Sequence, residues 1–150
     1  MENIELVRID DRMLHGQVVS TWLKDYSIEQ VLIINDKAAN DPIQKSVAGL
    51  AAPKEVKVHL FGVDQFIDIL KKTPIKRKTM LIFTTSTDVL KLVENGLDIK
   101  EVNVGGMRYN ENRKRLSKAV SVTPEEEEAF KKLIEKDIKV FIQMIPKSDE

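Results

Sequence analysis

The sequence predicts a single-domain α/β protein with an open, twisted, mostly parallel sheet of about seven strands and helices on both faces. Short β-branched runs alternate along the chain with helical patterns of about ten residues. Residues 30–34 are apolar throughout, as in a strand that is buried on both faces. The chain has 150 residues, 42% of them hydrophobic and 32% charged, which suits one domain with a substantial core.

Each expected element follows from a local pattern. Apolar and β-branched runs predict strands at residues 4–9, 30–34, 54–60, 79–83, 101–104, 117–122 and 140–144. Helical spacing of apolar residues predicts helices at 16–26, 42–53, 63–72 and 88–95, with a last helix beginning at 124. Residues 146–150 are expected to form a frayed tail.

Capping residues and prolines mark several helix ends. The pairs Asp41-Pro42 and Thr123-Pro124 each supply an N-cap followed by a proline for the first helical position. Gly96 is a suitable stop for the helix at 88–95. These signals predict where helices begin and end more sharply than the apolar spacing does.

The stretch at 105–117 has no clear helical pattern, and alternation returns at 117–122. We therefore expect a hairpin-like link that makes strand 117–122 antiparallel to its neighbour. Right-handed crossovers place the other strand-to-helix turns at one edge of the sheet. The loops expected at that edge are 10–16, 35–41, 84–87 and 105–113.

Composition excludes several classes of function. The 24 basic and 24 acidic residues balance, which argues against wholesale nucleic-acid binding. The absence of cysteine excludes disulfides, thiolate zinc sites and cysteine nucleophiles. No leader-like segment or membrane-length apolar run occurs, so we expect a cytoplasmic protein that meets a membrane only through a partner.

The turn after the first strand gathers the most chemically active side chains. Residues 8–18 read RIDDRMLHGQV and include His15, one of only two histidines. Ligands of open α/β sheets bind at the carboxyl ends of strands. The helix expected to begin at this point would offer the N–H groups around Gly16 and Gln17 to an anion. Arg12 could bind two oxygens of a phosphate or carboxylate.

An imidazole at this position can act as a nucleophile or acid–base group. Asp10 could accept a hydrogen bond from one ring nitrogen of His15 and leave the other nitrogen exposed. Asp11 is the alternative for this role, and spacing does not separate the two. In the plainer interpretation, Arg12 merely pairs with one of these aspartates.

Other loops at the same edge offer further candidates. Hydroxyl and N–H groups at Thr84, Thr85 and Ser86 could bind the same anion, or these residues could only cap the next helix. Gly105-Gly106 could form a nest for phosphate oxygens or a plain turn. Charged residues expected to face a partner are Arg8, Asp36, Arg108 and Arg113.

Neither a metal nor a cofactor is expected. The two histidines are far apart in the chain, and His59 lies within a predicted strand, where a structural role is expected. The chain has no GxxxxGK[ST] loop and no G-x-G-x-x-G motif after a strand, so nucleotide-binding folds of those types have no support.

The segment 8–18 closely resembles the active-site loop of one family, the mannose/sorbose-type enzyme IIB subunits of the bacterial phosphoenolpyruvate-dependent sugar phosphotransferase system. Met13-Leu14 replaces the family's commoner Leu-Ile pair, which is a mild apolar exchange. The resemblance spans essentially the whole chain in collinear order. Its supporting segments are IND at 34–36, AND at 39–41, NVGGM at 103–107 and QMIP at 143–146.

The resemblance implies that residues 1–150 form one IIB domain with a defined chemistry. A IIA unit would pass a phosphoryl group to His15, which would hand it to a sugar held by the membrane subunits IIC and IID. Arg12 would bind the phosphoryl group and Asp10 would support His15. A homodimer is also considered, and the identity of the sugar is left open.

Two other functions are weighed against this one. A receiver-type signalling domain also has paired acidic residues after its first strand. It needs an aspartate at the end of its third strand, where this chain reads His59-Leu60-Phe61-Gly62. The second alternative is a module that binds a small anion without covalent transfer.

Overall fold

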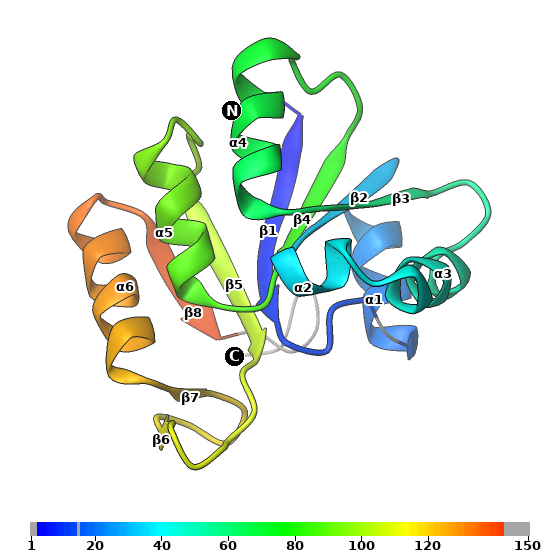
Figure 1. The fold of residues 1–150 in the computed structure, drawn as a ribbon. Helices are drawn as coiled ribbons and strands as arrows, with labels where there is room; N and C mark the ends of the chain where they lie inside the picture. The colour runs from blue at the N-terminus through cyan, green and yellow to red at the C-terminus, as the bar shows by residue number, and fades with distance from the viewer. Residues whose placement is uncertain (1–2, 15, 143–150) are drawn as a thin grey trace.

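The computed structural model describes residues 3–14 and 16–142, with the backbone alone for residues 16–19 and 51. Six strands form the main sheet in the order β3-β2-β4-β1-β5-β8, and every pairing between them is parallel. The α/β fold class predicted from the sequence is confirmed (Figure 1). The strands are β1 (Ile4–Asp10), β2 (Gln30–Ile34), β3 (Lys57–Phe61), β4 (Thr79–Phe83), β5 (Glu101–Gly106) and β8 (Lys139–Ile142).

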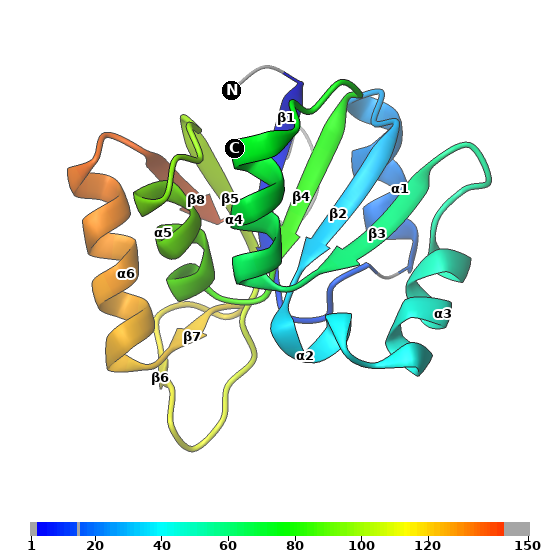
Figure 2. The same cartoon turned by 45° about the horizontal axis from the view of Figure 1, so that its top comes forward.

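The helices cover both faces of this sheet. Figure 2 shows α4, α5 and α6 in front of it and α1 behind. In the described part of the chain, no helix is long and apolar enough to cross a membrane. The helices are α1 (Gly16–Asp25), α2 (Asp36–Ala39), α3 (Pro42–Ala51), α4 (Val63–Lys72), α5 (Ser86–Glu94) and α6 (Pro124–Glu135).

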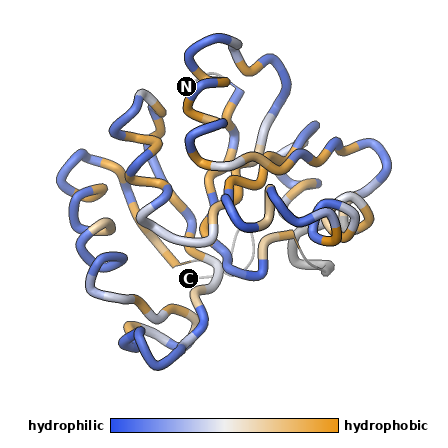
Figure 3. The backbone as a smooth tube through the Cα atoms, viewed as in Figure 1, coloured by the Kyte–Doolittle hydropathy of each residue, from blue (hydrophilic) through white to orange (hydrophobic). Residues whose placement is uncertain are grey.

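The core consists of two apolar layers, one on each side of the sheet. Phe66 of α4, Leu92 of α5 and Leu133 of α6 belong to one layer. Trp22 of α1 and Ala48 of α3 belong to the other. Hydrophobic residues accordingly follow the central strands in Figure 3, while the turns are mostly hydrophilic.

The sheet order places a topological switch at the carboxyl ends of β1 and β4. The chain leaves β1 through α1 toward β2, and it leaves β4 through α5 in the opposite direction toward β5. The two connecting helices therefore lie on opposite faces of the sheet. Ligands of open α/β sheets bind at such a point.

Several elements differ from the sequence predictions. The short helix α2 was not expected, although its N-cap Asn35 accepts a bond from the Ala38 backbone N–H at 2.8 Å. Strand β3 begins at Lys57 because residues before it form a turn, with Val56 N–H bonded to the Pro53 carbonyl. The expected tail at 146–150 lies outside the described residues, as does the last part of the predicted strand 140–144.

The prediction of a strand at 117–122 in the main sheet is corrected. Strand β7 (Ser121–Val122) pairs antiparallel with β6 (Lys114–Arg115) in a separate two-stranded sheet. β8 pairs with β5 along the edge that strand 117–122 was expected to take. The backbone near Leu116 bends instead, since the N–H groups of Leu116 and Ser117 both bond the Val120 carbonyl. Part of the alternating apolar pattern at 117–122 therefore lies in a tight turn.

Candidate active site

The candidate site begins where β1 ends. The backbone N–H of Met13 donates to the Asp10 carbonyl at 2.9 Å and closes a turn directly after the strand. Met13 has a φ of 60°, a left-handed conformation that is uncommon for a residue with a side chain. Such conformations cluster at functional sites. Helix α1 begins at Gly16, so its first-turn N–H groups follow this turn closely in the chain.

Asp10 lies between two arginines and is only 1% exposed. Its Oδ2 is 3.5 Å from Nη2 of Arg8. Its Oδ1 accepts a bond from the backbone N–H of Arg12 at 3.1 Å and lies 3.4 Å from Nε of the same residue. The Arg12 side chain is 43% exposed, so its guanidinium contacts Asp10 and also reaches solvent at the switch point.

Arg8 is buried, which corrects the prediction that it faces a partner. Its guanidinium lies over the Trp22 ring of α1, with Cζ 4.8 Å from the ring centroid. A Cβ on Gly105 would overlap this guanidinium, so the glycine leaves the room that Arg8 occupies. Burial lowers the pKa of Arg8 from its ordinary value, while Asp10 acts in the opposite direction.

Asp11 turns to a different part of the same edge. Its Oδ2 accepts a bond from the backbone N–H of Arg108 at 2.7 Å and lies 3.4 Å from Nη1 of Arg113. The Asp11 backbone N–H also donates to the Gly106 carbonyl at 3.0 Å. The side chain of Arg108 is 72% exposed, and its role in facing a partner stays a prediction. Asp11 thus connects the turn after β1 to the loop after β5.

Arg113 continues this connection into α6 and is nearly buried, so its predicted position facing a partner is also corrected. Its Nε and Nη2 donate to the two carboxylate oxygens of Glu126 at 2.9 and 2.7 Å. Burial would raise the pKa of Glu126, but bonds from Arg113, the Thr123 backbone and Thr85 outweigh it and lower that pKa. The pKa of Arg113 is raised: burial would lower it, but its bonds to Glu126 and Asp11 prevail.

The polar residues after β4 bond mainly to neighbouring elements. Thr85 caps α5 and donates its hydroxyl to Glu126 at 2.8 Å. The hydroxyl of Ser86, which has no exposed surface, donates to the Glu126 carbonyl at 2.8 Å. Thr84 accepts a bond from the Asn35 side chain at 2.9 Å. These contacts favour the capping interpretation for Thr85 and a contact with α6 for Ser86 over phosphoryl binding.

The predicted residues after β2 and β5 also lie against neighbouring elements. Asp36 is exposed, and its carboxylate accepts the Val63 backbone N–H at 2.8 Å, which joins α2 to the start of α4. Gly105 and Gly106 complete strand β5 rather than forming a separate turn. Gly106 lies beside Asp10 and Arg12, since an added Cβ would be 3.5 Å from Asp10 Oδ1.

A hollow of about 310 Å³ opens between this turn and the loop after β5. Among the described residues, four cationic side chains contribute to its lining, while the one carboxylate there, Asp11, already contacts two arginines. The surface beside Arg12 therefore favours anions. The cationic residues are Arg12, Arg108, Arg115 and Lys118.

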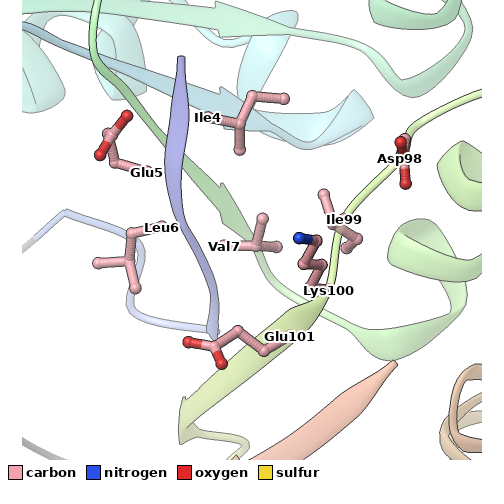
Figure 4. A pocket seen from close by; sticks show the side chains of 8 residues that line it. All are labelled: Ile4, Glu5, Leu6, Val7, Asp98, Ile99, Lys100 and Glu101. Carbon is pink, nitrogen blue, oxygen red and sulfur yellow. The ribbon is translucent and has the colours of Figure 1, made fainter. Parts of the chain in front are cut away.

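Another cavity, of about 360 Å³, lies at the amino ends of β1 and β5 (Figure 4). It is on the opposite edge of the sheet from Asp10, and none of the described site residues lines it. The residues that line it are Ile4, Glu5, Leu6, Val7, Asp98, Ile99, Lys100 and Glu101.

Some predicted residues lie outside the description, and others were missed. His15 is not among the described residues, and only the backbone is described for Gly16 and Gln17. His59 is exposed on β3, with its ring stacked on Phe61 at 6.1 Å. Sequence reasoning missed Glu126 as the partner of Arg113. The glutamates at 125–128 look alike in the sequence, but the Thr-x-x-Glu capping box at 123–126 could have singled out Glu126.

The comparison with protein families shows which family the chain belongs to. The model described as "PTS system sorbose subfamily IIB component" matches residues 4–150. The chain belongs to this family. The resemblance inferred from the turn after β1 is therefore confirmed over nearly the whole chain, and the receiver-type alternative loses its support.

Individual relatives support the same family assignment. The fructose-specific EIIB component of Bacillus subtilis is 35% identical over 147 residues, covering 97% of this chain and 90% of the relative. The sorbose-specific EIIB component of Klebsiella pneumoniae is 33% identical, covering 95% and 87%. A mannose-specific EIIAB component of Escherichia coli is 36% identical, and the match takes up 95% of this chain but 44% of that longer protein.

Solved structures give the same result for the fold. The crystal structure of the IIB domain of the Klebsiella pneumoniae sorbose permease superposes with a TM-score of 0.91 at 33% identity, covering 98% of this chain and 90% of that one. The N-acetylgalactosamine-specific IIB component 1 of Escherichia coli has a TM-score of 0.89 at 34% identity, covering 97% and 96%. The chain is therefore a phosphotransferase component that receives a phosphoryl group from IIA and transfers it to a sugar during transport together with a membrane IIC component.

Proposed function

We propose that His15 carries the phosphoryl group, that Arg12 binds its oxygens and that Asp10 supports the imidazole. The observation that carries the proposal is the contact of Arg12 with buried Asp10 at the switch point of the sheet. The position of His15 in the motif, directly before α1, supports its assignment as the nucleophile.

The contacts of the two aspartates favour Asp10 over Asp11 in the supporting role. The carboxylate of Asp11 is engaged by Arg108 and Arg113 of the loop after β5. Asp10 instead contacts Arg12, which is three residues before His15 in the sequence. A carboxylate that holds one imidazole nitrogen keeps the ring in the tautomer whose other nitrogen can attack.

In the proposed transfer, the free ring nitrogen of His15 attacks phosphorus in line. The new N–P bond forms while the P–N bond to the phosphohistidine of IIA breaks, and the IIA histidine leaves. Arg12 and the first-turn N–H groups of α1 would stabilise charge on the three equatorial oxygens. In the second step a sugar hydroxyl attacks phosphorus, the N–P bond to His15 breaks, and the hydroxyl proton passes to the leaving imidazole or to solvent. Positioning and charge stabilisation are the main demands of this chemistry.

Partners beyond IIA and IIC also belong to the proposal. We infer that residues 1–150 work as one IIB unit that docks from the cytoplasm on the membrane subunits IIC and IID. A homodimer is retained as part of this proposal. The relatives are named for fructose, mannose, sorbose and N-acetylgalactosamine, which supports a hexose or amino sugar as the acceptor.

The test uses labelled phosphoenolpyruvate, the general transfer proteins and a IIA donor. We expect one label on His15 that is lost in acid and kept in base, as for phosphohistidine. His15→Ala should take up no label, whereas His59→Ala, the matched control, should be labelled normally. Normal labelling of His15→Ala would refute the proposal, and a label that base removes would favour the receiver-type chemistry.

A further inference from the structure

Two arginines contact the buried carboxylate of Asp10, and their surroundings are unlike. Arg8 is 1% exposed and contacts Oδ2, while the Arg12 side chain is 43% exposed and contacts Oδ1. The Arg12 backbone N–H also bonds Oδ1, and this bond does not depend on where the side chain lies. One cation is thus part of the interior and the other is at the surface.

The surroundings of Arg8 fix its guanidinium in place. Trp22 covers one side of it from α1, and the backbone of Gly105 in β5 lies against it, where a Cβ would overlap. Arg8 is paired in register with Asn103, so it sits between β5 and α1 at the centre of the sheet. A planar guanidinium stacked on an aromatic ring and enclosed by backbone has little freedom to move.

The surroundings of Arg12 are suited to movement. The Nε–Oδ1 distance of 3.4 Å is long for a charged hydrogen bond, and the residue lines the cationic hollow beside the turn. A phosphoryl dianion arriving there would compete with the carboxylate for this guanidinium. If Arg12 moved away, Asp10 would remain buried, and a buried carboxylate is costly unless a cation stays with it.

We propose that Arg8 is a positioning residue that acts through Arg12: it stays with Asp10 as a resident counter-ion and so allows Arg12 to leave the carboxylate for the phosphoryl group. Without Arg8, the buried carboxylate would depend more strongly on its ion pair with Arg12. Arg12 would then be held by the carboxylate instead of serving the transferring group. This inference rests on the proposed function because it assigns Arg12 to the phosphoryl oxygens.

The test compares single-turnover transfer from labelled phospho-IIA in the wild type, Arg8→Met, Arg8→Lys, Asp10→Asn and the double variant Arg8→Met/Asp10→Asn. We expect Arg8→Met to lower the maximal transfer rate about tenfold to a hundredfold while the donor concentration at half-maximal rate changes by less than about threefold. Arg8→Lys keeps the charge and should recover most of the rate. The double variant should be no slower than Asp10→Asn, because the neutral amide that replaces the Asp10 carboxylate needs no counter-ion.

Arg77→Met is the matched control, since Arg77 is exposed and precedes β4 at the opposite edge of the sheet. Circular dichroism reports whether each variant is folded. If Arg8→Met does not fold, Gly105→Ala displaces the same guanidinium without changing any charge and should slow transfer in the same way.

Three results would overturn the inference. They are a wild-type rate in Arg8→Met, an Arg8→Lys variant as slow as Arg8→Met, and losses that multiply in the double variant. A wild-type chain that took no label on His15 would instead refute the proposed function, and this inference with it. Normal wild-type labelling together with an unimpaired Arg8→Met variant refutes the inference alone.

Discussion

The consecutive aspartates Asp10 and Asp11, where β1 ends, make different contacts. Asp10 is the last residue of β1 and is 1% exposed, and it contacts Arg8 and Arg12. Asp11 reaches the loop after β5, where it accepts the Arg108 backbone N–H and contacts Arg113. Since Asp10 ends the strand and Asp11 is the first residue of the turn, their side chains meet different neighbours. One Asp-Asp pair can therefore provide a buried carboxylate for the site and a brace between two loops.

The difference shows what each side of the edge contributes. The Asp10 side joins β1 to α1 through Arg8 and Trp22, close to the proposed chemistry. The Asp11 side joins the turn after β1, the loop after β5 and α6 through Arg113 and Glu126, and Glu126 also bonds Thr85 after β4. The first network should affect transfer most, and the second should affect folding stability and the placement of the loop.

The largest effect should come from exchanging each aspartate for asparagine. Asp10→Asn keeps the shape but removes the negative charge and replaces one of the two acceptor oxygens with an NH2 donor, so the imidazole tautomer is held less well and we expect transfer to fall by about a thousandfold. Asp11→Asn should slow transfer by less than about tenfold, because its bonds go to the loop after β5. Quenched-flow transfer from phospho-IIA measures both. Equal losses would remove the distinction between the two residues.

The next effect concerns two neighbouring ion pairs of unequal burial. Arg113 and Glu126 have side chains 11% and 7% exposed, while Lys114 and Glu127, one residue further along each segment, are 66% and 32% exposed. Arg113→Gln strands a nearly buried carboxylate and should cost about 3 kcal/mol of unfolding free energy. Lys114→Gln should cost less than about 0.5 kcal/mol. Urea unfolding at neutral pH measures both, and similar costs would contradict the burial argument.

The same pair predicts a pH dependence. The pKa of folded Glu126 is lowered, so it lies below the unfolded value of about 4.3. The stabilisation from the ionised carboxylate is therefore complete above about pH 5 and is lost as the pH falls through the folded pKa. The difference in stability between the wild type and Arg113→Gln should shrink over that range. A difference that stays constant down to about pH 3 would assign the effect of Arg113 to packing alone.

Local signals in the sequence predicted the fold class and the bounds of several elements. The apolar run of β4 fixed both of its ends, and Asp41-Pro42 fixed the start of α3. The 107–122 region was predicted less well because a two-residue strand pairing and a tight turn both resemble a short alternating strand. Short elements of this kind depend on tertiary contacts rather than on periodicity.

The roles of the arginines could not be read from the sequence. Arg8 and Arg113 look like surface charges beside a ligand loop, but both are enclosed by contacts made far along the chain. Arg8 needs the space left by Gly105, and Arg113 needs Glu126. Which charged residue is buried depends on such long-range pairings, whereas the motif itself is local and was found directly.

A smaller effect should come from two glycines that differ in their surroundings. A Cβ on Gly105 would overlap the Arg8 guanidinium, while at Gly49 in α3 nothing lies within 4 Å. Gly105→Ala should cost about 2 kcal/mol of unfolding free energy, because the buried guanidinium must shift. Gly49→Ala should add about 0.5–1 kcal/mol, since alanine is the better helix former. Thermal unfolding monitored by circular dichroism compares them, and a stabilised Gly105→Ala would show that Arg8 is not held in that space.

The smallest effect comes from a second acid at the same helical position as Glu126. Asp88 occupies the third residue of α5 as Glu126 does in α6, but burial and the nearby Asp36 raise the pKa of Asp88 to about 6. The ionised carboxylate therefore lowers stability above about pH 6, and the wild type gains stability as the pH falls from about 7 toward about 4. Asp88→Asn should add about 1 kcal/mol at about pH 8, a value reduced for solvent screening, and nothing near about pH 4. Urea unfolding at both pH values tests this, with exposed Asp68→Asn as the control. A gain that is the same at both pH values would mean that the charge of Asp88 is not its cause.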